Sequence, residues 1–340
     1  MKIDVLCGSG SPNGVTPDDL YGKNGRIGVG GSEYALLTLC EGWHKRGHEV
    51  TLYNSPKNAD RIFEQLPTVA FDKNAKRDIL IVNREPTPKA YKANGKKVFF
   101  SCDQYTVGDF AHFATAVDQI VSISPFHSAY LAIHYGIRES TVIDLPIRSW
   151  EYDTKLEKVA NRLIFTSVPD RGLVLVAEMW TKLQAQIPDI SLVITSDYRL
   201  WGSASPLNEQ YVNRFIRAKN VQFLGAVPRE RLIQEQLKAQ IHLYPCSYPE
   251  LFCIAVAESQ IAGALPITSG IGALSTTNMG VVIQGDAQGA GTQRLFIDKT
   301  VEYLKNEKLP DIQENLRKKA LERFSLDRIL NDWDRLVLNG

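Results

Sequence analysis

Short apolar runs recur along the chain, each followed by a polar or glycine-containing turn and then by a stretch with helical spacing. Such runs, rich in β-branched and aromatic residues, predict strands that are buried on both faces. The first half has predicted strands at residues 3–7, 49–53, 79–82, 98–101, 119–122 and 141–143. The second half has predicted strands at residues 163–167, 192–195, 221–224, 241–244, 265–268 and 281–283.

Strands that alternate with helices predict parallel sheets covered by helices, which is the α/β class. With 340 residues, the chain has room for two such domains. The break falls in residues 144–162, which have mixed charges, a proline and no clear strand. We therefore predict two doubly wound, Rossmann-like domains that face each other across a cleft, at residues 1–150 and 151–310. Residues 311–340 predict a closing pair of helices that packs back across the hinge.

Composition and charge narrow the class of protein. Hydrophobic residues make up 44% of the chain and charged residues 23%, as in soluble globular proteins. The net charge of +1 gives no overall attraction to nucleic acid, so no nucleic-acid partner is expected. No apolar run approaches the ~20 residues that span a bilayer, so we expect at most peripheral membrane contact.

The cysteines indicate the compartment. There are five, scattered and odd in number, with no C-x-x-C pair and no histidine at zinc spacing. They predict reduced thiols in a cytoplasmic protein without a zinc site.

Residues 248–277 hold the most informative polar pattern. Glu250 precedes a predicted helix and Glu258 follows eight residues later, just downstream of the strand at 241–244. A carboxylate accepts hydrogen bonds from two vicinal hydroxyls at once. The positive end of this helix favours an anion at three N–H groups, those of Phe252, Cys253 and Ile254. The pattern favours a ligand rich in hydroxyls and phosphate.

A glycine-rich loop at residues 8–33 follows the first strand and leads into a predicted helix at 34–46. Gly30 and Gly31 allow a phosphate or sugar to approach the backbone, and we expect Ser32 to cap the helix. The dinucleotide fingerprint needs a tight turn directly after the strand, and about 20 residues intervene here. Alone, the loop is a weak signal.

The first turn of the second half contains one arginine. Arg171 ends a strand-to-helix loop and Gly172 begins the helix. A guanidinium at this place can bind a diphosphate with two parallel hydrogen bonds and stabilise the charge of a leaving group.

The order of motifs resembles retaining glycosyltransferases of the GT-B fold, family 4 (glycosyl transferases group 1). GGSE at 30–33 and WHKRGHEV at 43–50 are similar to the opening motifs of that family. SISPFHSAYLAIHYGI at 122–137, PDRGL at 169–173 and VQFLGAV at 221–227 resemble later ones. PELFCIAVAE, with Glu250 and Glu258, is similar to the E-x7-E motif. The resemblance covers nearly the whole chain.

The resemblance implies transfer of a hexose from a nucleotide-diphosphate sugar to a hydroxyl acceptor, such as a glycan or a lipid-linked sugar, without a further cofactor. Glu250 would contact sugar hydroxyls, and Arg171 would neutralise the departing diphosphate. The anomeric configuration would be kept by front-face departure, with a diphosphate oxygen helping to deprotonate the acceptor.

The resemblance also implies donor-binding residues. Glu258 would bind the ribose, and Val227 would lie near the base. The backbone of Phe252, Cys253 and Ile254 would hold the sugar and diphosphate. Gly30 and Gly31 would approach the reacting end from the other domain.

Two departures from the family pattern concern the site. Thr166 and Ser167 stand where a basic residue usually precedes the Arg171 equivalent, so the source of a second positive charge is open. Cys102-Asp103 replaces the usual His-Asp pair after the fourth strand, which leaves the identity of the sugar open. His112 is the nearby candidate to substitute for that histidine.

Other functions were weighed against this one. A glycosidase would need two carboxylates flanking one bond, whereas Glu250 and Glu258 belong to one loop and helix. A nucleotide-sugar epimerase of the same fold and a non-catalytic nucleotide-sugar-binding subunit stay open. No metal site is expected, because the only D-x-D, Asp332-Trp333-Asp334, lies on the terminal helix, where we expect both aspartates to be exposed.

Overall fold

The computed structural model describes residues 1–8, 14–23, 28–56, 62–104, 110–201 and 206–339. The chain divides into two compact units. Unit 1 comprises Met1–Ile147 and Phe324–Gly340, and unit 2 comprises Arg148–Arg323. The sequence placed the corresponding divisions at residues 150 and 310. The two crossings between the units are adjacent, since the Ile147 N–H donates to the Phe324 carbonyl at 2.8 Å.

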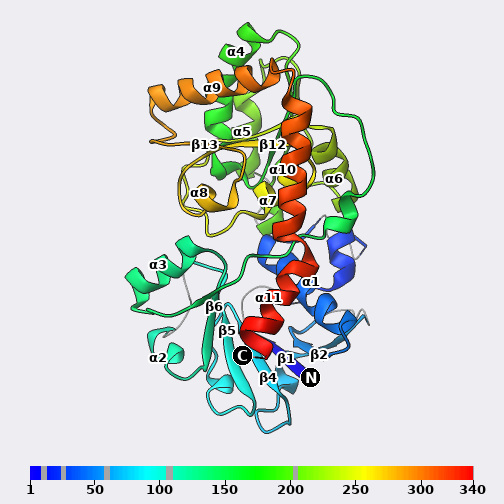
Figure 1. Ribbon diagram of the computed structural model, residues 1–340, viewed down its shortest axis with the longest axis vertical. Helices are drawn as coiled ribbons and strands as arrows, with labels where there is room; N and C mark the ends of the chain where they lie inside the picture. The colour runs from blue at the N-terminus through cyan, green and yellow to red at the C-terminus, as the bar shows by residue number, and fades with distance from the viewer. Residues whose placement is uncertain (9–13, 24–27, 57–61, 105–109, 202–205, 340) are drawn as a thin grey trace. The chain divides into compact units, whose positions relative to one another are not determined.

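Unit 1 is built on a parallel sheet of seven strands in the order β3-β2-β1-β4-β5-β6-β7 (Figure 1). The strands are β1 (Lys2–Cys7), β2 (Glu49–Tyr53), β3 (Glu64–Leu66), β4 (Ile79–Asn83), β5 (Lys96–Phe100), β6 (Gln119–Ser122) and β7 (Thr141–Val142). The strand order reverses beside β1, as expected for a doubly wound sheet. The helical segments are η1 (Pro17–Tyr21), α1 (Gly31–Lys45), η2 (Thr68–Ala70), η3 (Pro88–Ala90), α2 (Phe110–Ala114), α3 (Pro125–Tyr135), α11 (Leu326–Trp333) and the π-helical turn η7 (Asp334–Leu338).

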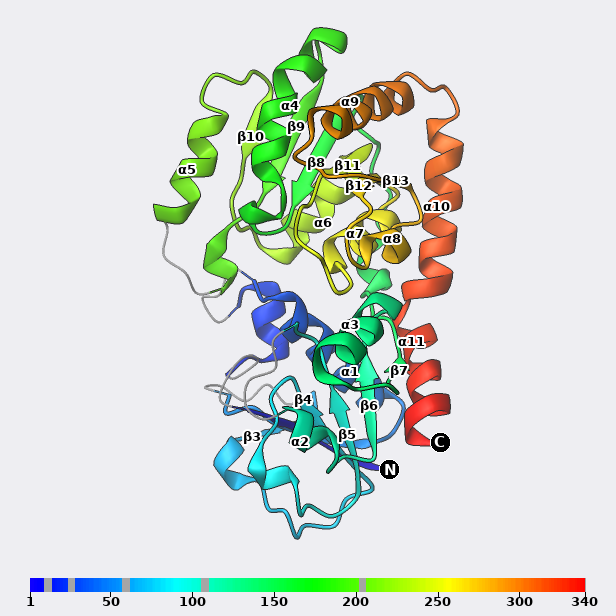
Figure 2. The ribbon, with the colours of Figure 1, turned by 90° about the vertical axis from the view of Figure 1, so that its left-hand side faces the viewer.

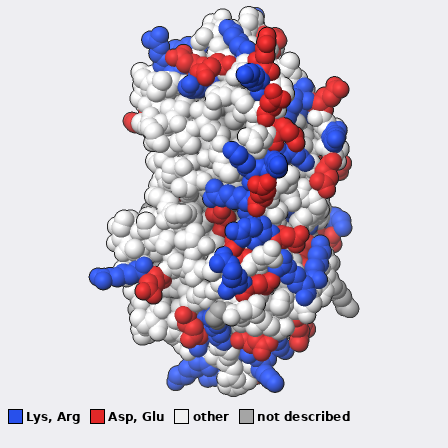
Figure 3. Space-filling model, viewed as in Figure 1, with Lys and Arg blue, Asp and Glu red and all other residues white. Residues whose placement is uncertain are grey.

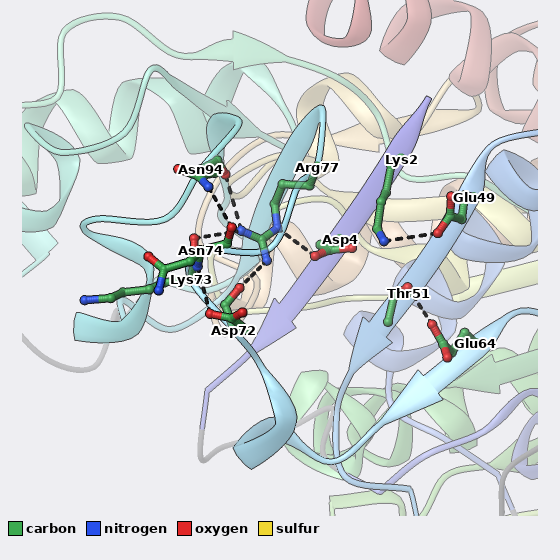
Figure 4. Close-up of polar contacts among 10 residues, drawn as sticks. All are labelled: Lys2, Asp4, Glu49, Thr51, Glu64, Asp72, Lys73, Asn74, Arg77 and Asn94. Atoms are coloured by element: carbon green, nitrogen blue, oxygen red, sulfur yellow. Dashed lines mark hydrogen bonds and ion pairs between the residues drawn. The ribbon is translucent and has the colours of Figure 1, made fainter.

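The sequence did not predict β3. This strand has only three residues, of which two are polar, and it forms the edge of the sheet beside β2. The Thr51 hydroxyl donates to Glu64 Oε2 at 3.0 Å, as Figure 4 shows. A short polar edge strand has no apolar run to reveal it, because its outer side does not need burial.

Adjacent phenylalanines on β5 fill the two faces of the unit 1 sheet, because successive strand residues point to opposite sides. The Phe99 ring lies 5.0 Å from that of Phe110, in the cluster under α2 and α3. The Phe100 ring lies 5.3 Å from that of Trp333 on α11, which in turn lies 5.2 Å from that of Trp43 on α1. The C-terminal helix α11 is therefore part of the core of unit 1.

A buried ion pair lies within the unit 1 sheet. Arg77 Nε donates to Asp4 Oδ2 at 2.6 Å, and neither side chain is exposed (Figure 4). The guanidinium also donates to the carbonyls of Asp72, Lys73 and Asn94, at 2.5, 3.2 and 3.4 Å. The arginine thus ties the loop before β4 and the loop before β5 to the middle of β1.

Unit 2 has a parallel sheet of six strands in the order β10-β9-β8-β11-β12-β13. The strands are β8 (Arg162–Thr166), β9 (Ser191–Thr195), β10 (Val221–Phe223), β11 (Ile241–Tyr244), β12 (Leu265–Ser269) and β13 (Val281–Ile283). The helical segments are η4 (Ser149–Tyr152), η5 (Pro169–Arg171), α4 (Leu173–Gln186), η6 (Tyr198–Trp201), α5 (Pro206–Arg214), α6 (Arg229–Lys238), α7 (Ile254–Ile261), α8 (Leu274–Thr277), α9 (Ala290–Leu304) and α10 (Leu309–Phe324). All twelve predicted strands of the two halves are present, within one or two residues of their predicted ends.

Helices cover both faces of the unit 2 sheet. α4 packs against α9 and α5 on one side, and α6 packs against α7 and η4 on the other (Figures 1 and 2). α10 is tied to this second group, since Arg317 Nη1 donates to the Ile261 carbonyl at 2.7 Å and Nη2 donates to the Tyr152 carbonyl at 2.9 Å.

The expectation that Asp332 and Asp334 are exposed is wrong. Asp332 accepts hydrogen bonds from Arg328 and Arg335, and its side chain is 15% exposed. Asp334 pairs with Arg46 of α1, and its side chain is 29% exposed. The reason is local for Asp332, whose partners lie three and four residues away, and tertiary for Asp334, because the C-terminal segment packs against α1 and Arg46 follows that helix.

Charged side chains of both signs are interspersed on the face drawn in Figure 3. Lysine and arginine beside aspartate and glutamate agree with the net charge of +1. Among the described residues, no helix is both long enough and apolar enough to cross a membrane.

Candidate active site

Two loops at the carboxyl ends of the adjacent strands β8 and β11 carry the predicted catalytic side chains. Arg171 ends η5 after β8, and Glu250 follows β11. Gly172 has φ of +110°, and a Cβ there would lie 2.4 Å from the Pro245 carbonyl oxygen. Only glycine permits this approach of the two loops, which places Arg171 beside Glu250.

The Arg171 side chain is held on several sides. Its Nε lies 3.3 Å from Glu250 Oε1, and its Nη1 donates to Asp170 Oδ2 at 3.0 Å. Its Cζ lies 3.6 Å from the centre of the Tyr248 ring, which is a cation–π contact. The Arg171 and Glu250 side chains are 12% and 17% exposed, so the pair is shielded but still reached by solvent.

The Glu250 carboxylate also accepts a hydrogen bond from a core residue. The Tyr244 hydroxyl donates to its Oε1 at 2.8 Å and lies 3.3 Å from the Ser167 Oγ. Burial raises the pKa of Glu250, while the charge of Arg171 and the Tyr244 hydroxyl oppose this. Burial lowers the pKa of Arg171, but Glu250 and Asp170 raise it by more. The arginine is therefore a permanent cation, and its charge favours the ionised form of Glu250 against the effect of burial.

The helix that follows this loop provides backbone donors. Val256 and Ala257 both donate to the Cys253 carbonyl at 3.2 Å, so the hydrogen-bond ladder of α7 begins there. The N–H groups before it lie at the positive end of the helix. Cys253 has φ of +77°, a conformation that strains a side-chain-bearing residue. Phe252 is buried, whereas Cys253 and Ile254 are half-buried.

Glu258 has different partners from Glu250. Its side chain is 5% exposed, and its Oε1 lies 2.9 Å from Nη2 of Arg229, the first residue of α6. Gln236 Nε2 donates to its Oε2 at 3.4 Å. Glu250 therefore lies beside Arg171, whereas Glu258 contacts another arginine.

The loop before α6 carries Val227, which is half-buried. Asp197, which follows β9, holds this loop, since its Oδ2 accepts from the Ala226 N–H at 3.2 Å. Asp197 also accepts from the Arg199 N–H at 2.8 Å and from Asn208 Nδ2 at 2.6 Å. Burial opposes ionisation of Asp197, but these hydrogen bonds and that of the Arg199 side chain outweigh it and lower its pKa to about 2.

In unit 1, the predicted glycines lie at the start of α1. Gly30 is the N-cap and Gly31 the first helical residue, so the expectation that Ser32 caps the helix is wrong. The helix begins one turn before the apolar pattern does. Glu33 Oε2 folds back over the N-cap, where a Cβ on Gly30 would lie 2.4 Å from it. Residues 9–13 and 24–27 of the glycine-rich loop lie outside the described residues.

Arg84 is a further charged residue near these glycines. It directly follows β4 and has φ of +63°, and its Nε forms an ion pair with Asp103. Its Nη1 lies 3.8 Å from Glu33 Oε1. Asp103, a predicted sugar contact, is thus paired with an arginine that the motifs did not indicate.

The other two predicted sugar contacts, Cys102 and His112, differ in burial. Cys102 is half-buried, and burial raises the pKa of its thiol well above the ordinary value. His112 is exposed on α2 with its ring 5.5 Å from that of Tyr91. The histidine beside the Cys102 segment is instead His127, whose Nε2 lies 3.3 Å from Ser101 Oγ. Burial lowers the pKa of His127 to about 4, so it is neutral.

Sequence reasoning missed the residues that hold the predicted ones. Tyr244 and Tyr248 both precede the motif of Glu250, and a hydroxyl at the last position of a buried strand was an available signal for Tyr244. Arg229 and Asp197 had no comparable signal, because their partners are distant in sequence. Within the described ranges, no cluster of His, Cys, Asp and Glu side chains is arranged to hold a metal ion.

Solved structures share the fold over the whole chain. A glycosyltransferase from Rickettsia africae is 16% identical, with a TM-score of 0.75, and the match covers 98% of this chain and 97% of that one. Anabaena HepE, solved in complex with UDP-glucose, is 15% identical with a TM-score of 0.70, and both chains are covered completely. Sucrose-phosphate synthase from Thermosynechococcus elongatus is 14% identical with a TM-score of 0.71, covering 99% and 98%. These matches confirm the predicted fold class, two Rossmann-like halves as in GT-B glycosyltransferases.

No curated protein sequence matches the chain. Residues 156–320, which make up most of unit 2, match the family described as glycosyl transferases group 1. This stretch contains Arg171, Val227, Glu250 and Glu258. This match, together with the shared fold, identifies the chain as a glycosyltransferase.

Proposed function

We propose that the protein is a retaining, family 4 enzyme that transfers a hexose from a nucleotide-diphosphate sugar to a hydroxyl acceptor. One observation carries this proposal: a guanidinium fixed by Glu250, Asp170 and the Tyr248 ring, at the strand ends of unit 2. Anabaena HepE has been solved with UDP, with UDP and glucose, and with UDP-glucose, which supports a UDP-sugar as the first donor to examine.

In this proposal Arg171 binds the diphosphate and stabilises the charge that grows on it as the glycosidic bond breaks. The guanidinium needs no reorganisation, because its neighbours already fix its plane. The start of α7, Phe252 to Ile254, supplies N–H donors to the same phosphates. The second oxygen of Glu250, Oε2, accepts hydrogen bonds from hydroxyls of the sugar. The ion pair of Oε1 with Arg171 keeps the carboxylate and the guanidinium side by side.

The bond changes follow from retention. The bond between the anomeric carbon and the diphosphate oxygen breaks, and the acceptor oxygen bonds to the same face of that carbon. The acceptor proton passes to an oxygen of the departing diphosphate, so no protein nucleophile takes part. Gly30 and Gly31 of unit 1 would approach the reacting end, with Cys102, Asp103 and His112 as candidate sugar contacts.

Glu258 and Val227 are proposed to bind the ribose and the base. We further propose that no cofactor or metal ion is needed, because both aspartates of the single D-x-D sequence are engaged by arginines. The acceptor is proposed to be a glycan or a lipid-linked sugar, reached from the cytoplasm or at a membrane surface. The five free thiols are consistent with a cytoplasmic protein.

The test begins with thermal stabilisation by UDP-, GDP- and ADP-sugars, since a ligand that binds the folded protein raises its melting temperature. Hydrolysis or transfer of the stabilising donor is then measured for wild type and Arg171→Ala. We expect Arg171→Ala to lower turnover by about 100-fold or more, with only a modest loss of nucleotide binding.

Arg294→Ala is the matched control, because Arg294 is 83% exposed on α9 and should leave both quantities unchanged. Unchanged turnover and binding in Arg171→Ala would contradict the proposal. Binding without turnover in wild type would favour a non-catalytic subunit, and epimerised donor without acceptor would favour an epimerase.

A further inference from the structure

We propose that Arg229 and Gln236 are positioning residues, which set the orientation of the Glu258 carboxylate for the ribose hydroxyls of the donor. The inference rests on the proposed function, in which Glu258 is the ribose ligand. It assigns a task to two residues of α6 that no motif indicated.

The first arm of the arrangement is ionic. Arg229 Nη2 lies 2.9 Å from Glu258 Oε1, and Arg229 Nε pairs with Glu151 of η4. Glu151 Oε1 in turn accepts from Arg148 Nε at 2.8 Å. The four side chains are between 4% and 8% exposed and alternate in charge. Each buried charge therefore has a counter-charge, as burial requires.

The second arm is neutral. Gln236 Nε2 donates to Glu258 Oε2 at 3.4 Å, and the Gln236 Oε1 accepts from the Tyr152 hydroxyl at 2.7 Å. Arg229 and Gln236 are seven residues apart on α6, so they lie two turns apart on the same side of that helix. Glu151 and Tyr152 are neighbours in η4. The short turn η4 therefore positions both oxygens of Glu258 indirectly, through Arg229 and Gln236 of α6.

The arrangement leaves hydrogen-bonding capacity in the carboxylate. Within the described part of the chain, Glu258 Oε1 is buried and accepts no hydrogen bond of good geometry, although Arg229 is close to it. A carboxylate offers about four acceptor positions, and the contacts with Arg229 and Gln236 do not use all of them. The unfilled position suits a ligand hydroxyl that arrives after a small rotation of the side chain.

Arg229 also links two parts of the donor site. It follows Val227 by two residues, so the loop proposed to meet the base leads directly into the group that holds the ribose ligand. Removal of Arg229 would leave the buried charge of Glu258 without its counter-charge, and the carboxylate would lose its fixed direction. Binding of the ribose should then weaken, while the reaction at the sugar should not change.

The first step identifies which of UDP, GDP and ADP stabilises wild type most. That nucleoside diphosphate and its 3′-deoxy analogue are then compared as competitive inhibitors. We expect wild type to prefer the 3′-hydroxyl form by about tenfold, as for a hydrogen bond to a charged group. Arg229→Gln should reduce this preference to about threefold or less. It should raise KM for the donor about tenfold and leave kcat within about threefold.

Arg162→Gln is the matched control. Arg162, whose side chain is 15% exposed, forms an ion pair with the buried Glu235 of α6, and its loss should lower stability without changing the preference for the 3′-hydroxyl. Arg229→Lys keeps the charge and should restore part of the preference. If Arg229→Gln does not fold, Tyr152→Phe, which removes only the hydroxyl that holds Gln236, should shift the preference in the same direction by a smaller factor.

Two outcomes would overturn the inference while the proposed function stands: a wild type that binds both analogues equally, or an Arg229→Gln variant with an unchanged preference. If none of the three nucleotides binds, the proposed function fails, and this inference fails with it.

Discussion

Asp197 is a buried residue whose negative charge is stabilised by hydrogen bonds. It is 2% exposed, yet it accepts hydrogen bonds from two backbone N–H groups and from the side chains of Arg199 and Asn208. A carboxylate with this many donors stays ionised in a buried place. Because one of the donors is Ala226, the charge of Asp197 fixes the loop that carries Val227.

This predicts a loss of stability in acid. The pKa of Asp197 lies at about 2 in the folded chain and at 3.8 in the unfolded chain, so the unfolded state binds the proton first as pH falls. The contribution, about 2.5 kcal/mol, is complete only above pH ~5 and is lost progressively as pH falls towards ~1. Urea unfolding of wild type and Asp197→Asn at pH 7, 4 and 2.5 should show their difference in free energy of unfolding shrinking in acid. Asp189→Asn is the exposed control, and a difference independent of pH would refute the assignment.

At the same scale, the sequence indicated the motif residues and not the residues that hold them. Arg171 and Glu250 stand in motifs with a recognisable chemistry, and the structure places them 3.3 Å apart. Tyr248 and Asp197 act through a ring face and a set of N–H groups. Such supports depend on how loops fold over one another, which no local pattern encodes.

The elements show where local patterns suffice. Twelve strands were predictable from short apolar runs, because the strands of a parallel sheet covered on both faces are mostly apolar. β3 was not, since an edge strand of three residues carries no such requirement. The start of α1 was misplaced for a related reason: its first turn, beginning at Gly31, has no apolar residue to mark it.

The turn between β8 and α4 allows a test at this scale. Gly172→Ala places a Cβ against the Pro245 carbonyl in a left-handed conformation, so the two loops must move apart. We expect a loss of roughly 2 kcal/mol or more in the free energy of unfolding. We also expect a fall in turnover, because Arg171 would move away from Glu250.

Gly136→Ala is the control for this change. Gly136 also has a positive φ, of +69°, but a Cβ there meets nothing within 4 Å. It should cost about 1 kcal/mol from backbone strain alone and leave turnover unchanged. Equal effects of the two substitutions on stability and turnover would show that the close approach of the loops is unimportant.

For the whole molecule, the C-terminal segment belongs to the unit formed by the N-terminal half. The Trp333 ring lies against both Trp43 of α1 and Phe100 of β5, and its side chain is 1% exposed. Along the chain, the helix that completes the core of unit 1 therefore follows the whole of unit 2. Residues 1–147 alone should be unstable.

Trp333→Ala tests this dependence. Removal of a buried tryptophan should lower the stability of unit 1 by about 3–5 kcal/mol. Limited proteolysis with mapped fragments should then show faster cleavage in residues 1–147, with the rate in residues 148–323 nearly unchanged. Trp150→Ala is the control, because Trp150 is 39% exposed. Equal acceleration in both units would contradict a role confined to unit 1.

The sequence alone determined the α/β class, the strands and the motif residues Arg171, Glu250 and Glu258, because periodicity and motif chemistry are local properties of the chain. Only the tertiary structure decided which charge meets which. It paired Glu250 with Arg171 and Glu258 with Arg229, and it joined Asp334 to Arg46, almost the whole chain apart. Ion pairs between distant segments depend on how the sheets and helices pack together, and a local pattern along the chain does not encode that packing.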